Sequence, residues 1–223
     1  MNIEESWEKL NKNEELAMRA ECQRRRQSAE DSEVPGRTID EYEQVLEIPI
    51  TKEFVGKTVL DLGSGETGQL AKAAAKREID VYSLSGAWGS EKYRKILKEG
   101  FSKNAVAGLA QELPFKSDTF DSVLSSWAIP MYLEKNKREY EASFREIARV
   151  LKPGGKAYLA PIYERWISPP FFNEIREALK KEGVANIDIQ EVKDPKKVDR
   201  YKIVLTKLAR HPSSTAEQRY RKP

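Results

Sequence analysis

The stretch VLDLGSGETG, residues 59–68, decides the fold. The apolar run at 58–62 has the composition of a buried parallel strand, and it leads directly into a loop with three glycines. Leu70, Ala73 and Ala74 follow at helical spacing. This order predicts a strand, a tight loop and a helix. In an open parallel sheet, such a loop lies at the carboxyl end of its strand, where ligands bind.

The alternation of strands and helices continues on both sides of this stretch. On the N-terminal side, Ile39, Tyr42, Val45 and Leu46 recur at helical spacing until Pro49, which predicts a helix across the entrance of the main domain. Further strands are predicted at 79–84, 105–109, 120–126, 156–162, 186–192 and 201–207, and helices around Tyr93, before Pro153 and at 170–182. The fold class is therefore α/β, with a mostly parallel seven-stranded sheet, helices on both faces and a closing antiparallel pair of strands.

The glycine loop is the first candidate for a binding site. Gly63 and Gly65 would let a ligand approach the backbone, or they serve packing alone. Asp61 could fix the loop by accepting its N–H bonds, or it could meet a cationic or hydroxyl group of a ligand. GSGETG matches the dinucleotide fingerprint, but Ser85 stands where that fingerprint requires an acid. A nicotinamide cofactor is therefore poorly supported.

The composition excludes several kinds of chemistry. The chain has one Cys and one His, at Cys22 and His211, so it has no internal disulfide and no Cys/His cluster for zinc. His211 stands near the C-terminus among Pro, Ser and Arg, which disfavours a nucleophilic mechanism with an imidazole base. No metal site is predicted, and the sequence identifies no catalytic residue.

Three segments occur in a fixed order: VLDLGSGETG at 59–68, AQELPFKSDTFDSVLSS at 110–126 and ARVLKPGGKAYL at 148–159. Together they resemble the class I S-adenosylmethionine-dependent methyltransferases, in the group with an LPF-x-x-x-x-FD segment. The resemblance covers about residues 45–207. It implies a Rossmann-like methyltransferase fold, S-adenosylmethionine as the cofactor and a methyl-transfer reaction. Because a sulfonium cofactor carries its own reactive methyl group, the protein mainly aligns the reactants and requires no metal, Cys or His.

The resemblance also implies where the ligands bind. In that family the glycine loop lies under the methionine part of the cofactor, an acid after the second strand holds the ribose, and residues before LPF hold the adenine. The end of the fourth strand lines the methyl-transfer site. The implied cofactor-binding residues are Asp61, Gly63, Ser64, Gly65, Glu66, Thr67, Gly68, Ser85, Ala110, Gln111, Glu112 and Ser126. The implied substrate-binding residues are Trp127, Met131 and Tyr132.

The sequence departs from the family pattern at three places. The loop is one residue longer between Gly65 and Gly68, and Glu66 there could pair with the cofactor's amino group or point to water. Ser85 replaces the ribose-binding acid, which forfeits ~1.5–3 kcal/mol, or roughly tenfold to a hundredfold in affinity. Leu109 replaces an Asp, and a place in the strand core is favoured over packing on the adenine. These departures leave open a second function, a binding or scaffold protein with weakened catalysis.

The exit of the fourth strand, SSWAIPMYLE at 125–134, is the predicted acceptor side. It lacks the Asn/Asp-Pro-Pro-Tyr signature of amino-directed nucleic-acid methyltransferases, and a small-molecule acceptor is mildly favoured. Trp127 and Tyr132 could stack on a planar acceptor, or they could be core aromatics. Asp121 is expected to fix the start of this strand, and the Leu and Phe of the LPF segment are expected to anchor their loop.

The two ends differ in charge from the predicted domain at 34–207, whose first part, 34–56, is the covering helix and a linker. Residues 1–33 have a net charge of −3 and are expected to form a helical arm. Residues 193–223 have a net charge of +7, and 208–223 are predicted to be a basic, disordered tail or an arm for nucleic acid. The acidic N-terminus does not read as a signal peptide, so a cytoplasmic setting is expected.

Overall fold

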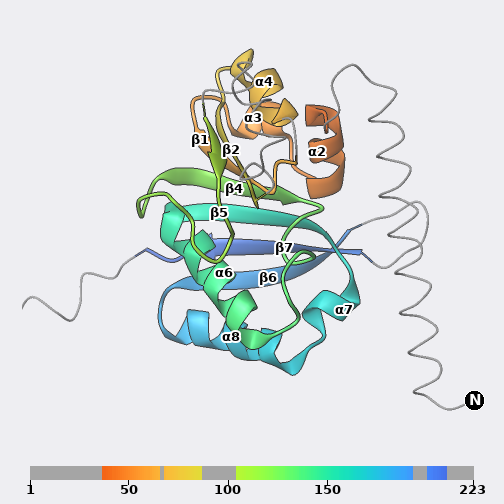
Figure 1. The fold of residues 1–223 in the computed structure, drawn as a ribbon, viewed down its shortest axis with the longest axis vertical. Coiled ribbons are helices and arrows are strands. Elements are labelled where there is room, and N and C mark those ends of the chain that lie inside the picture. Colours follow the sequence, from red (N-terminus) through yellow and green to blue (C-terminus); the bar gives the residue numbers. More distant parts are fainter. Residues whose placement is uncertain (1–36, 66–67, 87–103, 193–199, 210–223) are drawn as a thin grey trace, which may run out of the picture.

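The protein is built on one seven-stranded sheet in the order β3-β2-β1-β4-β5-β7-β6 (Figure 1). The computed structural model describes residues 37–65, 68–86, 104–192 and 200–209. The strands are β1 (Thr58–Leu62), β2 (Asp80–Ser85), β3 (Ala105–Ala107), β4 (Phe120–Ser126), β5 (Leu151–Ile162), β6 (Ala185–Val192) and β7 (Arg200–Lys207). Strands β1 to β5 pair in parallel, and β7 pairs antiparallel with both β5 and β6. The predicted sheet, with its antiparallel closing pair, is confirmed.

Helices cover both faces of the sheet, as predicted (Figure 1). The first face carries α2 (Ile39–Leu46), α3 (Ile50–Glu53) and α4 (Gln69–Ala75), and the second carries α6 (Lys137–Val150) and α8 (Pro170–Lys181). The short helix α7 (Glu164–Ile167) follows β5. Each face has its own hydrophobic core, because alternate residues of the central strands point to opposite sides of the sheet.

Helix α2 begins at a complete capping box. The Thr38 hydroxyl accepts the Glu41 N–H at 3.2 Å, and the Glu41 carboxylate accepts the Thr38 N–H at 2.8 Å. The residues at helical spacing, Ile39, Tyr42 and Leu46, are buried against the sheet. The apolar periodicity that predicted this helix is therefore its core face.

Predicted boundaries differ from the structure by two residues or more at the end of α6, at the start of β5, which begins at Leu151 rather than at residue 156, and at the end of β3. The helix predicted to end at Pro153 ends at Val150, because the chain becomes extended at Leu151 and pairs there with β4, so the Pro-Gly-Gly turn lies within β5. Strand β3 ends at Ala107 and does not reach residue 109. A Cβ at Gly108 would lie 3.1 Å from the side chains of both Leu84 and Pro114, so the chain is closely packed there, and it turns at 109–112, where the Glu112 N–H donates to the Leu109 carbonyl.

The amino edge of the sheet is held by the residues expected to be structural. Asp121 Oδ2 accepts the N–H of Thr58 at 2.9 Å and so ties the starts of β4 and β1 together, as predicted. The LPF segment is anchored from α6, since Arg149 donates to the carbonyl oxygens of Phe115 at 2.7 Å and Leu113 at 2.9 Å. Asp121 therefore positions the starts of two strands, and Arg149 fixes the LPF segment that follows the predicted adenine residues.

Several predictions fall outside the described residues. These are the N-terminal arm at 1–33, the helix around Tyr93, the loop residues Glu66 and Thr67, and all of the basic tail except Leu208 and Ala209. They stay predictions, and so does the nucleic-acid alternative for the tail.

Candidate functional site

The loop after β1 is tied to the neighbouring strand β2. The N–H groups of Gly63 and Ser64 both donate to the carbonyl oxygen of Leu84, at 2.8 and 3.1 Å. Gly63 has φ +82°, and a Cβ there would lie 2.2 Å from the Cβ of Ala128. Gly63 is therefore required by backbone conformation and by packing, whether or not a ligand binds.

Gly65 differs from Gly63 in its surroundings. It also has a positive φ, +74°, but a Cβ there would meet nothing within 4 Å. Gly68, also at positive φ, is the N-cap residue of α4. Because no contact among the described residues needs a glycine at 65 beyond its φ, the space beside it can accept a ligand against the backbone.

Asp61, the predicted acid at the end of β1, is 1% exposed and is bonded to α2. Its Oδ1 accepts a hydrogen bond of 2.7 Å from the hydroxyl of Tyr42, and its Oδ2 is buried with no partner among the described residues. Burial raises the pKa of Asp61 to about 7, although the Tyr42 hydrogen bond and the charge of Arg37 favour the carboxylate. The interpretation in which Asp61 accepts the loop's N–H bonds is wrong for Gly63 and Ser64, whose N–H groups go to Leu84.

The segment before α2 reaches the end of β4. Arg37 Nη1 donates to the carbonyl oxygen of Ser126, and the Ser126 hydroxyl is fully buried without a partner among the described residues. Arg37 and Tyr42 thus contact the carboxyl ends of β4 and β1. Sequence reasoning missed both as site residues. The available signal was a lone hydroxyl in the apolar stripe of α2, since a buried Tyr needs a polar partner.

The residues expected beside the ribose and adenine follow β2 and β3. Ser85 is buried at the end of β2, and Ala110 is also buried. Gln111 Nε2 donates a hydrogen bond to Glu139 Oε2 on α6. The Glu112 N–H donates to the carbonyl of Leu109 at 3.2 Å. The strand-core interpretation of Leu109 is wrong, because this side chain lies beyond β3 and is 62% exposed.

The predicted acceptor residues separate into two kinds. Trp127 is a core residue: it is 4% exposed, its backbone N–H donates to the carbonyl of Ala160 at 2.9 Å, and the guanidinium of Arg200 lies 5.5 Å from its ring centroid. Met131 is partly buried and packs on the same core. Tyr132 is 75% exposed, so the core interpretation fails for it and its ring is accessible to an acceptor.

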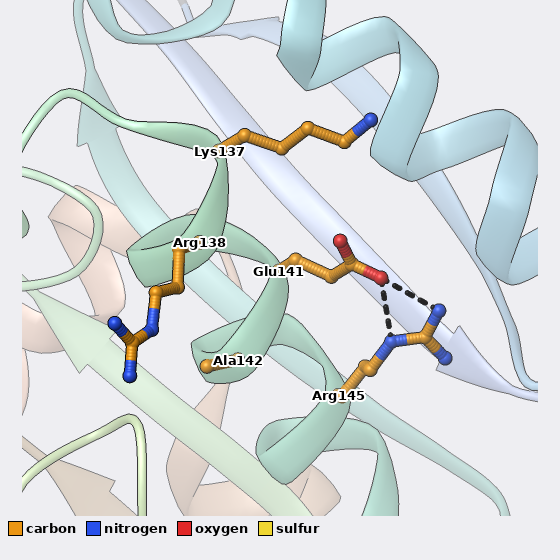
Figure 2. A pocket seen from close by; sticks show the side chains of 5 residues that line it. All are labelled: Lys137, Arg138, Glu141, Ala142 and Arg145. Carbon is orange, nitrogen blue, oxygen red and sulfur yellow. Dashed lines mark hydrogen bonds and ion pairs between the residues drawn. The ribbon is translucent and has the colours of Figure 1, made fainter.

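A shallow hollow on the outer face of α6 contains none of the predicted site residues. Figure 2 shows its lining residues, which are Lys137, Arg138, Glu141, Ala142 and Arg145. Arg145 pairs with Glu141 at 2.8 Å and with Glu182 at 2.7 Å, so its charge is neutralised across α6 and α8. These exposed ion pairs indicate a solvated helix face rather than a binding site.

The described residues contain neither a cluster of metal-ligating side chains nor a helix that could span a membrane. Over the described ranges, no three His, Cys, Asp or Glu side chains lie close enough together to hold a metal ion. None of the described helices has the length and apolar character needed to cross a membrane.

Residues 60–159 match the model of a protein family described as "Methyltransferase domain". A ubiquinone/menaquinone biosynthesis C-methyltransferase of Chromobacterium violaceum is 29% identical over 116 residues, which are 50% of this chain and 45% of that protein. A demethylmenaquinone methyltransferase of Mycobacterium marinum is 36% identical over 104 residues, or 45% of this chain and 39% of that protein. The chain thus matches less than half the length of these relatives.

Among solved structures, a chain of the complex between the Haloferax volcanii Trm112 methyltransferase activator and a methyltransferase is similar in fold. The TM-score is 0.53 at 21% identity, over 76% of this chain and 92% of that chain. Residues 60–159 are therefore similar to a methyltransferase domain, and the sheet has the Rossmann-like fold that class I S-adenosylmethionine-dependent methyltransferases share.

Proposed function

We propose that the protein transfers a methyl group from S-adenosylmethionine to a small-molecule acceptor. The observation that carries this proposal is the carboxyl end of β1, where the open backbone at Gly65 follows a buried carboxyl group, Asp61, whose Oδ2 has no hydrogen-bond partner among the described residues. The cofactor supplies an electrophilic methyl group: the acceptor's nucleophilic atom gains this methyl and loses a proton, and the electron pair of the broken carbon–sulfur bond stays on sulfur.

The residues of the chain fit the methionine end of this cofactor. Gly65 leaves space for the ligand, and Asp61 offers a buried acceptor oxygen to a cation. The hydroxyl of Ser126, buried at the end of β4, is a second polar group without a partner among the described residues. Gly63, Ser64 and the other predicted loop residues would complete this part, with Glu66 and Thr67 contributing from the longer loop.

The ribose and adenine end would be held by Ser85 and by Ala110, Gln111 and Glu112. Ser85 would give one hydrogen bond to the ribose where a carboxylate would give two, so affinity at this end is reduced. The exposed side chain of Leu109 would supply apolar contact at the mouth of the adenine site. The departures from the family pattern therefore weaken the binding without removing its framework.

The acceptor side would be formed by Trp127, Met131 and Tyr132. Buried Trp127 would form the floor, and the exposed ring of Tyr132 would stack on a planar acceptor. Two relatives are named as methyltransferases of ubiquinone or menaquinone biosynthesis, which supports a ring-bearing small molecule of the quinol class as the acceptor. Alignment of the reactants is the main task of these residues.

A binding or scaffold role with weakened catalysis is the second candidate. It is favoured by Ser85 at the ribose position and by a buried carboxyl group whose pKa lies about 7, because Asp61 is then only partly ionised at neutral pH. A measurement of cofactor binding distinguishes the two functions, since the scaffold role needs no cofactor.

Calorimetric titration with S-adenosylmethionine and S-adenosylhomocysteine tests the proposal. The wild-type protein is expected to bind both ligands with a Kd of about 1–100 μM, and Gly65→Arg is expected to abolish binding by filling the open space. Gly154→Arg is the matched control, because Gly154 has φ +77° and equally open surroundings at the other end of the sheet. Absence of binding to the wild type at ~1 mM ligand would refute the enzyme and favour the scaffold.

Turnover tests the acceptor class separately. A reduced naphthoquinone is expected to cause release of S-adenosylhomocysteine, and Tyr132→Ala is expected to reduce this release while leaving cofactor binding intact. Cofactor binding without turnover on this acceptor would refute the acceptor class alone.

A further inference from the structure

Helix α2 presents one polar atom to the interior of the protein, and that atom contacts the predicted cofactor site. The stripe of Ile39, Tyr42 and Leu46 is buried against the sheet, and within it the Tyr42 hydroxyl is the hydrogen-bonding group. This hydroxyl donates to Asp61 Oδ1 at 2.7 Å, 19 positions later in the sequence. The capping box at Thr38 fixes the start of the helix, and the position of Tyr42 in the first turn is therefore fixed as well.

The carboxyl group that Tyr42 contacts has few other partners. Ser83 and Leu124 are its neighbours in register on β2 and β4, and neither side chain is titratable. Arg37, before α2, contributes the favourable charge. Asp61 Oδ2 has no hydrogen bond among the described residues, although the atom is buried. A buried carboxylate oxygen without a partner is costly to the fold, which indicates that a ligand supplies the partner.

We propose that Tyr42 is a positioning residue of the cofactor site, whose hydroxyl holds Asp61 by Oδ1 and leaves Oδ2 for the ammonium group of the cofactor's amino-acid end. This inference rests on the proposed function. It adds that the covering helix takes part in cofactor binding through a single hydrogen bond. Tyr42 itself does not contact the reacting atoms.

The hydrogen bond also affects the protonation of Asp61, because it opposes the rise in pKa that burial causes. Because it favours the charged form, its loss raises the pKa of Asp61 above its present value of about 7. A protonated carboxyl group cannot attract an ammonium ion, so the affinity of a Tyr42→Phe variant falls at neutral pH. It recovers at alkaline pH, up to the point where the amino group of the ligand itself loses its proton.

The test compares Tyr42→Phe with Tyr140→Phe, a second buried tyrosine, which lies on α6 at the opposite face of the sheet. The Kd of S-adenosylhomocysteine is measured over about pH 6–9, together with that of methylthioadenosine, which lacks the amino-acid end. Tyr42→Phe is expected to weaken S-adenosylhomocysteine about tenfold at neutral pH and to move the rise in affinity to higher pH. Methylthioadenosine binding is expected to be unchanged in both variants.

A second comparison separates positioning from structure. In the Asp61→Asn background, Tyr42→Phe is expected to have no further effect on the binding of S-adenosylhomocysteine, because the hydroxyl acts through the carboxylate. Equal loss of both ligands in Tyr42→Phe, or a pH profile identical to that of Tyr140→Phe, would overturn the inference and leave the proposed function intact. Failure of the wild type to bind either ligand would overturn the proposed function and, with it, this inference.

Discussion

The burial of Asp61 gives the free energy of unfolding a distinct dependence on pH. The side chain is 1% exposed, and its pKa is about 7 in the folded protein against 3.8 in the unfolded chain. The folded state therefore binds a proton more tightly than the unfolded state does. The stability contributed by the protonated group is fully present below about pH 4 and is lost as the pH rises to about 7.

The size of this effect follows from the two pKa values. Since one pKa unit corresponds to 1.36 kcal/mol, the loss amounts to at most about 4 kcal/mol. This is a large fraction of the ~5–15 kcal/mol that stabilises a typical domain. Asp61→Asn keeps the size of the side chain and the acceptor for Tyr42 but cannot ionise. The variant is expected to match the wild type near pH 4 and to exceed its stability by up to about 4 kcal/mol near pH 8.

Urea unfolding at several pH values measures this difference directly. Other carboxylates whose pKa is lowered by ion pairs, such as Asp121 and Glu146, titrate equally in both proteins and cancel from the comparison. A stability difference between Asp61→Asn and the wild type that stays constant across this range would show that Asp61 is ionised with little cost, and it would refute the reasoning.

Three further substitutions have defined outcomes. Gly63→Ala should cost about 3 kcal/mol or more in urea unfolding, because its Cβ would meet Ala128 at 2.2 Å, whereas Gly56→Ala, at similar φ but in open space, should cost about 1 kcal/mol. Tyr140→Phe should leave the free energy of unfolding unchanged or raise it by about 1 kcal/mol, because the buried hydroxyl has no partner among the described residues; a loss above that amount would contradict this. Ser85→Asp, which restores the ribose acid, should tighten S-adenosylmethionine binding about tenfold by calorimetry, and weaker binding would show that the ribose lies elsewhere.

The sheet was predictable because its strands are short apolar runs separated by glycine-rich or polar turns, a pattern that depends only on local sequence. The boundaries that failed depend on contacts between distant segments. Gly108, directly after β3, lies between the side chains of Leu84 and Pro114, and the end of α6 is set by pairing of Leu151 with β4. Neither contact can be recognised from the spacing of apolar residues in the neighbouring sequence.

The site was predictable only in part for a related reason. Asp61 lies near the end of β1 and the glycine loop follows directly, so one stretch of sequence predicts both. Tyr42 occupies an apolar stripe where its ring alone explains its presence, and the target of its hydroxyl lies on another element. Trp127 and Tyr132 have the same two interpretations from the sequence, yet Trp127 is buried and Tyr132 is exposed. Between them the backbone changes direction, beginning at Trp127 with φ +57°.

The residues of the carboxyl edge can be sorted by whether the fold itself explains them. Gly63 is explained by Ala128, which leaves no room for a side chain. The space at Gly65 and the two buried oxygens, Asp61 Oδ2 and the Ser126 hydroxyl, have no such explanation within the described structure. A buried hydroxyl without a partner among the described residues also occurs in α6, at Tyr140, but a neutral group costs far less to bury than an ionised carboxyl group. Because the buried carboxyl group stands at the end of β1, just before the open backbone at Gly65, a cationic ligand bound there would recover part of the free energy that its burial costs.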